Sequence, residues 1–261
     1  MRYIIGLILS LFMLLPSWAS DGHVGHSGHA HDGRDSQFRL DLRLSPDTVE
    51  PGQPVLLTMA LYNGFGQMMT EFDVMHEKKM HLIIVRDGLD IFAHHHPEML
   101  ETGEFEKRLI FPEPGVYRLF ADFAPLGGQA STAMASLTVA GDPPSAPALE
   151  PYVPGQVRTP RLVADVEVNQ LSGLYQIVFD LSDENDMPIN DLEPYLGAMG
   201  HLVILSASGE DYVHAHPLQA TSGNRVAFDV RFPKPGIYKG WGEFKRGGQV
   251  HDVAIVFRVD Q

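Results

Sequence analysis

The chain contains no cysteine among its 261 residues. This absence excludes a lipoprotein anchor, disulfide bridges and thiolate zinc sites, and it excludes a blue-copper centre, which needs a cysteine sulfur. Any domain of this protein must therefore be stabilised by an ordinary hydrophobic core.

Positive charge is also scarce. Nineteen Lys and Arg residues stand against 33 Asp and Glu residues, which gives a formal net charge of −14. Such an acidic chain repels nucleic acid and anionic membrane surfaces, and it favours cations such as metal ions. We therefore expect metal ions, and no nucleic acid, among its partners.

A long hydrophobic run occurs only at the N-terminus. Arg2, the apolar residues 4–15 and the small-x-small tripeptide at 17–19 are typical of a signal peptide over residues 1–19. The apolar run is shorter than the ~20 residues of a spanning helix, so no transmembrane segment is expected after signal removal. The predicted location is the periplasm or the cell exterior.

A tail rich in Gly, Ser, Asp and His follows over residues 20–36. It has little to bury, so we predict that it is disordered. Four histidines of the tail would collect copper, nickel or zinc without selectivity: His23, His26, His29 and His31.

The rest of the chain reads as short strands. Segments such as FRLDLRLS, VLLTMALYN and GVYRLFADF are rich in β-branched, aromatic and aliphatic residues and are bounded by Gly, Pro and Asp. Residues 141–160 contain six prolines and two glycines, which predicts a semi-rigid linker. The predicted domains are residues 37–140 and 161–261.

The two predicted domains are copies of one module. At an offset of 120 residues, MHL matches GHL and HHHP matches HAHP; one residue later, FPEPGVY matches FPKPGIY and FADF matches WGEF. Two copies with strands at regular spacing predict an all-β chain of two tandem immunoglobulin-like β-sandwich domains. Closed barrels are the second alternative.

The repeat separates shared histidines from isolated ones. His76, His95 and His251 align with Leu, Ala and Ser in the other copy, so they are not part of a histidine set that both copies share. The shared histidines, which are the predicted metal ligands, are His81, His94, His96, His201, His214 and His216.

Strand parity predicts the geometry of the first set. His94 and His96 are two residues apart, so they point to the same face of a strand. The turn signal RDGLD separates them from His81. A two-residue loop at 87–88 would place His81 opposite His94, and a four-residue loop at 87–90 would place it opposite His96. Either register brings the three imidazoles to one face.

The segment ASGEDY predicts the same arrangement for the second set. Directly opposed Cβ atoms lie ~4.5–5.5 Å apart, which three imidazoles can bridge through one ion with bonds near ~2.0 Å. A turn whose imidazoles bond to the backbone is the alternative. Two converging sets favour metal, since imidazolium ions would repel each other on one face.

Copper is the expected metal and zinc the alternative, because imidazoles without thiolate suit Cu(II), Zn(II) or Ni(II) and copper binds most tightly at equal geometry. Asp122, Glu243 and His251 are candidates for a fourth ligand. For the two carboxylates, a solvated position on the surface is the favoured interpretation.

The segments KMHLIIVRDGLDIFAHHHPEM, YLGAMGHLVIL and YVHAHP carry a resemblance. The chain resembles a group of bacterial secreted or periplasmic proteins with repeated GH/MHL…HxHP modules, which accompany copper and other heavy-metal handling systems. The resemblance covers most of residues 50–260, and it implies a sandwich fold and a role in metal handling.

Three functions follow as hypotheses. The favoured one is a non-enzymatic, extracytoplasmic protein that sequesters copper or delivers it to a membrane metal exporter or a copper-enzyme assembly partner. The second is a structural or protein-interaction β-sandwich protein whose histidines are not ligands. The third is a copper enzyme, which needs an open coordination position and a substrate cleft.

Overall fold

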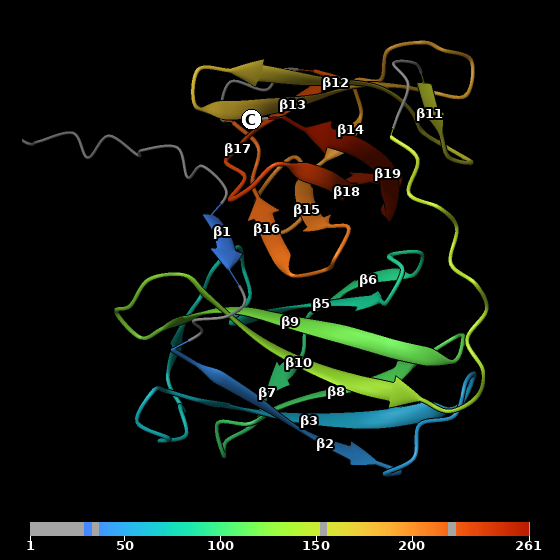
Figure 1. The fold of residues 1–261 in the computed structure, drawn as a ribbon. Coiled ribbons are helices and arrows are strands. Elements are labelled where there is room, and N and C mark those ends of the chain that lie inside the picture. Colours follow the sequence, from blue (N-terminus) through green and yellow to red (C-terminus); the bar gives the residue numbers. More distant parts are fainter. Residues whose placement is uncertain (1–28, 33–36, 152–155, 219–222, 261) are drawn as a thin grey trace, which may run out of the picture.

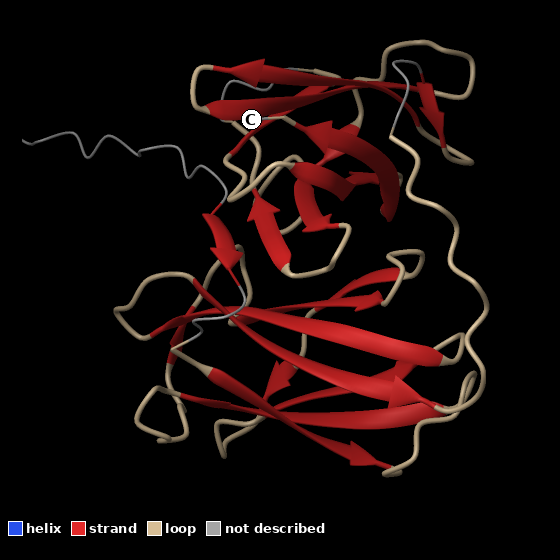
Figure 2. Ribbon diagram, in the orientation of Figure 1, coloured by secondary structure: helices blue, strands red, loops and turns tan. Residues whose placement is uncertain are grey.

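The computed structural model describes residues 29–32, 37–151, 156–218 and 223–260, and these residues form strands and loops without a helix (Figure 1 and Figure 2). The predicted signal peptide lies outside the described residues. Within the described ranges, no helix is long and apolar enough to cross a membrane. The strands form two β-sandwich domains, which confirms the predicted all-β, two-domain fold.

Each sandwich of the protein has an outer and an inner sheet. The outer sheet of the first domain has the order β2 (Arg39–Ser45), β3 (Pro54–Tyr62), β8 (Phe105–Ile110) and β7 (Glu98–Met99). Its inner sheet has the order β10 (Ser131–Val139), β9 (Gly115–Pro125), β5 (Met80–Arg86) and β6 (Phe92–His95), and β4 (Phe72–Asp73) pairs with β9.

The second domain repeats this plan. Its outer sheet has the order β11 (Gln156–Arg158), β12 (Val163–Leu171), β13 (Leu174–Ser182) and β17 (Arg225–Val230). Its inner sheet has the order β1 (His29–Asp32), β16 (Asp211–Ala215), β15 (His201–Ser206), β18 (Gly236–Arg246) and β14 (Leu192–Glu193), and β19 (Gln249–Val259) pairs with β18.

The two inner sheets face each other, so the molecule has four layers (Figure 1). One hydrophobic core lies inside each sandwich, and a third apolar cluster lies between the inner sheets. The third cluster consists of Ile83, Val85, Leu89, Phe120, Val203, Leu205, Tyr212 and Trp241. Two stacked ring pairs cross this interface, Phe92 on Trp241 and Phe120 on Tyr212, with centroids 4.8 and 4.5 Å apart.

The residue pattern of β5 explains why its sheet is covered on both faces. Leu82 and Ile84 point into the core of the first sandwich, whereas Ile83 and Val85 point into the cluster between the domains. Every residue of β5 is buried. A continuous apolar run is what a strand buried on both faces requires.

The repeated FPxPGxY segments form matching tyrosine corners. The Tyr117 hydroxyl donates to the Glu113 carbonyl oxygen, and the Tyr238 hydroxyl donates to the Lys234 carbonyl oxygen, both over 2.9 Å. A tyrosine that bonds back to the backbone a few residues upstream is a feature of immunoglobulin-like sandwiches.

Two predicted boundaries differ from the structure. Residues 29–32, predicted to be disordered with the rest of the tail, form β1 and pair with β16 in the register His29↔His214. Residues 156–158, predicted to belong to the linker, form β11 and pair with β12. In both cases the segment pairs with the outermost strand of a sheet, β16 or β12, whose backbone N–H and C=O groups provide hydrogen-bond partners. The composition of the segment does not reveal these partners.

Candidate metal centre

Two equivalent hairpins, β5–β6 and β15–β16, carry the six shared histidines. In the first hairpin, Ile83 pairs with His94, and Arg86 N donates to Ile91 O over 3.1 Å. This register corresponds to the four-residue loop at 87–90, which places His81 opposite His96. The second hairpin has the same loop length, since Val203 pairs with His214. The predicted convergence of the imidazoles is therefore confirmed for both copies.

Each hairpin presents its three histidines as a triad. The first triad is His81, His94 and His96, the second is His201, His214 and His216, and the ligand atoms within each triad lie within 4.8 Å of one another. An ion with bonds of about 2.0–2.1 Å needs nitrogens about 3.3 Å apart, so each triad would have to close by at most about 1.5 Å. Side-chain rotation covers such a distance.

Backbone carbonyls fix one histidine of each triad. His81 Nε2 lies 3.0 Å from the carbonyl oxygen of Met75, and His201 Nε2 lies 2.9 Å from that of Tyr195. A carbonyl oxygen only accepts, so Nε2 of each ring carries the proton. The lone pair of each ring is then on Nδ1, the atom that faces the other histidines.

Carboxylates exchanged between the domains orient a second histidine of each triad. His94 Nδ1, in the first domain, lies 2.7 Å from Glu243 Oε2 in the second domain. Reciprocally, His214 Nδ1 lies 2.9 Å from Asp122 Oδ2 in the first domain. A carboxylate that accepts from the second nitrogen of a histidine is the usual support of a metal ligand.

The interpretation of the two carboxylates as solvated surface groups was wrong. Asp122 is 7% exposed and Glu243 is 3% exposed, because the docked domains cover both strands that carry them. Neither belongs to a group of metal-ligating atoms. They bind the Nδ1 side of a histidine from the other domain.

The second triad has three buried nitrogens that nothing described in the structure satisfies. His201 Nδ1, His214 Nε2 and His216 Nε2 are buried and have no hydrogen-bond partner among the described residues. Asp122 also accepts from Thr132 Oγ1 over 2.6 Å and from the Tyr212 hydroxyl. These donors favour an ionised Asp122, so His214 Nδ1 is the donor and His214 Nε2 is a bare acceptor.

In the first triad, by contrast, two of the three histidines contact each other. His81 Nδ1 lies 3.1 Å from His94 Nε2, and His96 Nε2 has no partner among the described residues. Burial raises the pKa of Glu243 to about 8, so this carboxyl can donate its proton to His94 Nδ1. His94 Nε2–H then donates to His81, and ionisation of Glu243 would leave two lone pairs facing each other.

All six imidazoles are held neutral. Burial, and then the neighbouring imidazoles, lower the pKa of His81 to about 4 and that of His96 to about 2. Burial lowers the pKa of His94 to about 4. The pKa values of the second triad are lowered for the same first reason. Neutral imidazole is the form that binds a metal ion.

His76 joins the cluster although its repeat partner is Leu196. Its ring stacks on that of His216, with centroids 3.6 Å apart and an interplanar angle of 16°. His76 has a φ of 45° and sits in a two-residue turn closed by Met75 and Lys78. The comparison of the two copies correctly excluded His76 from the shared set, but it missed this contact from the first domain to the second triad.

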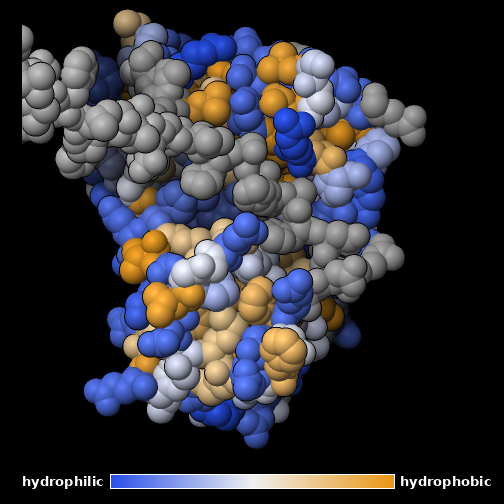
Figure 3. All heavy atoms as spheres, turned by 90° about the vertical axis from the view of Figure 1, so that its left-hand side faces the viewer, coloured by the Kyte–Doolittle hydropathy of each residue, from blue (hydrophilic) through white to orange (hydrophobic). Residues whose placement is uncertain are grey.

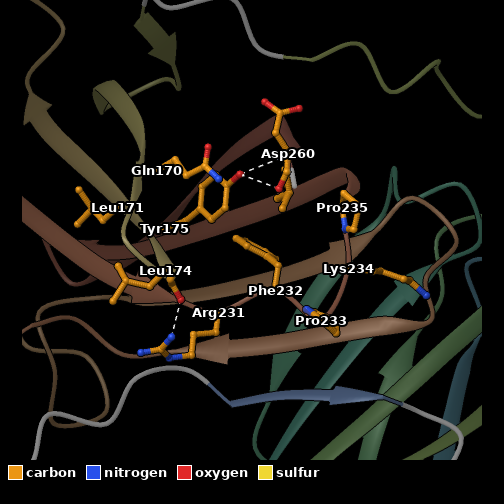
Figure 4. Close-up of a pocket in the computed structure, with 12 residues that line it drawn as sticks. Gln170, Leu171, Leu174, Tyr175, Arg231, Phe232, Pro233, Lys234, Pro235 and Asp260 are labelled. Carbon is orange, nitrogen blue, oxygen red and sulfur yellow. Dashed lines mark hydrogen bonds between the residues drawn. The ribbon is translucent and has the colours of Figure 1, made fainter.

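Other candidate residues lie elsewhere. His251 Nε2 is 3.3 Å from the Arg246 carbonyl oxygen, and neither triad includes this residue. His95 pairs with Leu82 and lies on the opposite face of β6 from His94. A pocket at the end of the second sandwich, around Phe232, has its polar groups bonded internally: Arg231 donates to the Gly173 carbonyl oxygen and Tyr175 to that of Asp260 (Figure 4).

The fold and the cluster together define a protein of two β-sandwich modules with a histidine centre between them. A family model described as a domain of unknown function, DUF8832, matches residues 35–141 and again residues 161–261. The chain therefore belongs to this family. No match was found among curated protein sequences.

Solved structures match this chain at low similarity. A tetra-tandem repeat from the extending region of a large adhesion protein is 11% identical, with a TM-score of 0.29, and the match covers 85% of this chain and 49% of that one. The adhesin FdeC of Escherichia coli is 15% identical, with a TM-score of 0.28, and 89% and 66% of the two chains are covered. Dimeric latent PorU from Porphyromonas gingivalis is 12% identical, with a TM-score of 0.28 and coverage of 87% and 24%.

Proposed function

We propose that this protein is an extracytoplasmic metal-binding protein that holds transition-metal ions at the histidine triads between its two domains. The observation that carries this proposal is the set of buried nitrogens without a hydrogen-bond partner in the second triad, His201 Nδ1, His214 Nε2 and His216 Nε2. Leaving a buried polar atom unpaired costs about 1–3 kcal/mol. Three such atoms converging on one point are explained by an ion that all three bind.

Copper is the metal that the donor set favours, with zinc as the alternative. All six ligands are imidazoles, and the chain offers no thiolate. Nitrogen donors bind Cu(II) more tightly than Zn(II) at equal geometry. Because the triads are buried, we propose binding rather than catalysis, with sequestration of the ion as the primary role.

Delivery to a membrane metal exporter or a copper-enzyme assembly partner is the extended form of this proposal. β1 supports it, because its backbone pairing places part of the His-rich tail along β16, the strand that carries His214. An ion collected by the tail would be released next to the second triad.

Metal titration of the full chain tests the function. The four tail histidines are replaced by serine, so that they do not contribute bound metal. We expect two copper ions per chain after gel filtration, and at least one fewer in the variants His94→Ala/His96→Ala and His214→Ala/His216→Ala. His95→Ala is the matched control, since the second copy already has Ala215 at this position. If the tail-substituted chain retains no copper or zinc, the proposal fails.

The alternative is a structural or protein-interaction module whose histidines tie the domains together. The 3.1 Å contact of His81 Nδ1 with His94 Nε2 favours it, because this pair is satisfied without an ion. The face shown in Figure 3 mixes apolar and hydrophilic residues over both domains and does not gather the apolar ones into one patch. Under this alternative the alanine variants lose stability and the parent chain retains no metal.

Asp122→Asn is expected to weaken copper binding at the second triad by roughly 10–100-fold. Asparagine cannot accept from Thr132, Tyr212 and His214 together, so His214 loses the acceptor that fixes its tautomer. Competition with a chelator at pH 7 measures the affinity. The control is Asp191→Asn. Asp191 is the exposed ion-pair partner of Arg246, so this substitution should leave the affinity unchanged. Equal affinities of Asp122→Asn and the parent would show that Asp122 does not support a ligand.

A further inference from the structure

The six histidines form one cluster, although the repeat presents them as two sets of three. The inner four rings are His81 and His94 of the first domain and His201 and His214 of the second. Their centroids are separated by 5.3 and 5.6 Å within a triad, and by 5.5, 5.7, 6.1 and 6.3 Å across the interface. Rings of opposite triads are thus nearly as close as rings of the same triad.

Each of the outer two histidines lies beside the two inner rings of its own triad. His96 lies 5.0 Å from His81 and 4.8 Å from His94, measured between ring centroids. His216 lies 5.1 Å from His201 and 4.8 Å from His214. The inner rings of each triad therefore contact the inner rings of the other triad. An ion held by one triad would lie next to the rings that hold the second ion.

Assembly of either triad depends on both domains. His94 is oriented by Glu243, and His214 is oriented by Asp122, so each domain supplies the carboxyl group that orients a ligand of the other. The two carboxyl groups also bear on the electrostatic repulsion between two adjacent cations. Buried cations need compensating charge, which Asp122 would supply beside the second triad and Glu243, once it has released its proton, beside the first.

From this arrangement we infer that the two triads hold their ions as one dinuclear centre spanning the domain interface. The inference rests on the proposed function and adds that the two ions are neighbours that interact. The ligand class is a pair of late first-row transition-metal ions, each bound by three imidazoles. The centre also acts as a clamp, because neither ion keeps its full set of oriented ligands when the domains separate.

Electron paramagnetic resonance of the Cu(II)-loaded chain tests the inference. The tail-substituted protein is loaded with two equivalents of Cu(II), and the spins are counted against total copper. Two neighbouring Cu(II) ions are expected to give a spin count below half of the copper content, or a dipolar-split spectrum with a half-field transition. Two isolated ions would give a full spin count without splitting.

A variant with one intact triad serves as the matched control. His201→Ala/His216→Ala should bind one copper ion in the first triad, with a full spin count and no half-field signal. Two bound ions that remain magnetically isolated in the parent chain would overturn the dinuclear centre and leave the proposed function standing. A single ion per chain, lost from variants of either triad, would also overturn it. Failure of the parent chain to bind copper would instead refute the proposed function itself.

Discussion

Saturation with copper is expected to raise the free energy of unfolding by about 4 kcal/mol for each occupied triad when the free ion is at 1,000 times its Kd. Two occupied triads give about 8 kcal/mol, and for a chain of this size that corresponds to an increase of roughly 15–30 °C in Tm. The ions bind only the folded, docked domains, since the ligands of each triad are oriented by a carboxyl from the other domain. Calorimetry of the metal-free and copper-loaded protein measures the effect.

The controls separate the triads from other sources of stabilisation. The tail histidines are replaced, because binding to the unfolded chain would reduce the shift. The variant His94→Ala/His214→Ala removes one ligand from each triad and should lose most of the increase, whereas His95→Ala should retain it. Addition of a chelator should return the loaded protein to its metal-free Tm. A shift below about 2 °C in the parent would contradict tight binding at either triad.

The stabilisation should also appear as coupling between the domains. The apolar cluster between the inner sheets already joins them through the Phe92–Trp241 and Phe120–Tyr212 stacks. Metal adds bonds on the same interface, at the histidine end of the hairpins. We therefore expect one unfolding transition in the loaded protein, because separation of the domains would break the metal centre and the apolar cluster together.

Much of the centre was predictable because its parts are local. The histidine triads follow from strand parity and loop length within 16 residues of chain, from His81 to His96, and the repeat supplies the same arrangement a second time. Such arguments need only the period of a β-strand and the geometry of a turn. They do not depend on how the domains pack.

Docking of the domains was not predicted, because it is set by contacts between residues far apart in the chain, such as Asp122 and His214, 92 positions apart, and His94 and Glu243, 149 positions apart. One signal was present in the segment MHLIIVR: Ile83 and Val85 are as apolar as Leu82 and Ile84, so both faces of the strand are apolar. A single sandwich buries only one face of each sheet, so the second face must be covered by something else. The same reasoning applies to HLVILS in the second copy.

The positions of Asp122 and Glu243 follow from this docking. Each lies beside a histidine on the neighbouring strand, with Asp122 paired to His81 and Glu243 paired to His201. Viewed within one domain, these carboxylates occupy an open sheet face, which predicts solvation. Only the second domain converts that face into an interface and provides the histidine that each carboxylate binds.

The metal-free protein is expected to unfold cooperatively as the pH falls from 6.5 towards 4. A histidine in the unfolded chain has a pKa near 6.5, while burial lowers the pKa of His81 and His94 to about 4. Between these values the unfolded chain binds protons that the folded chain excludes, so the stability that these histidines contribute is fully present above pH 6.5 and is lost as the pH falls below it. Each such histidine changes the free energy of unfolding by up to about 1.4 kcal/mol per pH unit.

Buried carboxyls, chief among them Glu243 and Asp252, oppose this trend but do not outweigh it. Burial raises the pKa of Glu243 to about 8, and burial together with the neighbouring Glu243 raises that of Asp252 to about 6. The folded state therefore binds protons at these two groups that the unfolded state has released, which lowers stability as the pH rises. The six triad histidines and His95 act in the other direction, so the net effect is acid lability.

Circular dichroism during thermal unfolding at pH 7, 5.5 and 4.5, in the presence of a chelator, measures the acid lability. The variant His96→Gln/His216→Gln removes two of the buried imidazoles, so its loss of stability between pH 7 and 4.5 should be smaller than that of the parent. Replacing the tail histidines instead should leave the parent's pH dependence unchanged, because the prediction rests on the buried triads. A parent chain whose Tm is the same at pH 7 and pH 4.5 would show that protonation of the triads does not lower the free energy of unfolding. The buried imidazoles described above would then not be held neutral by their surroundings.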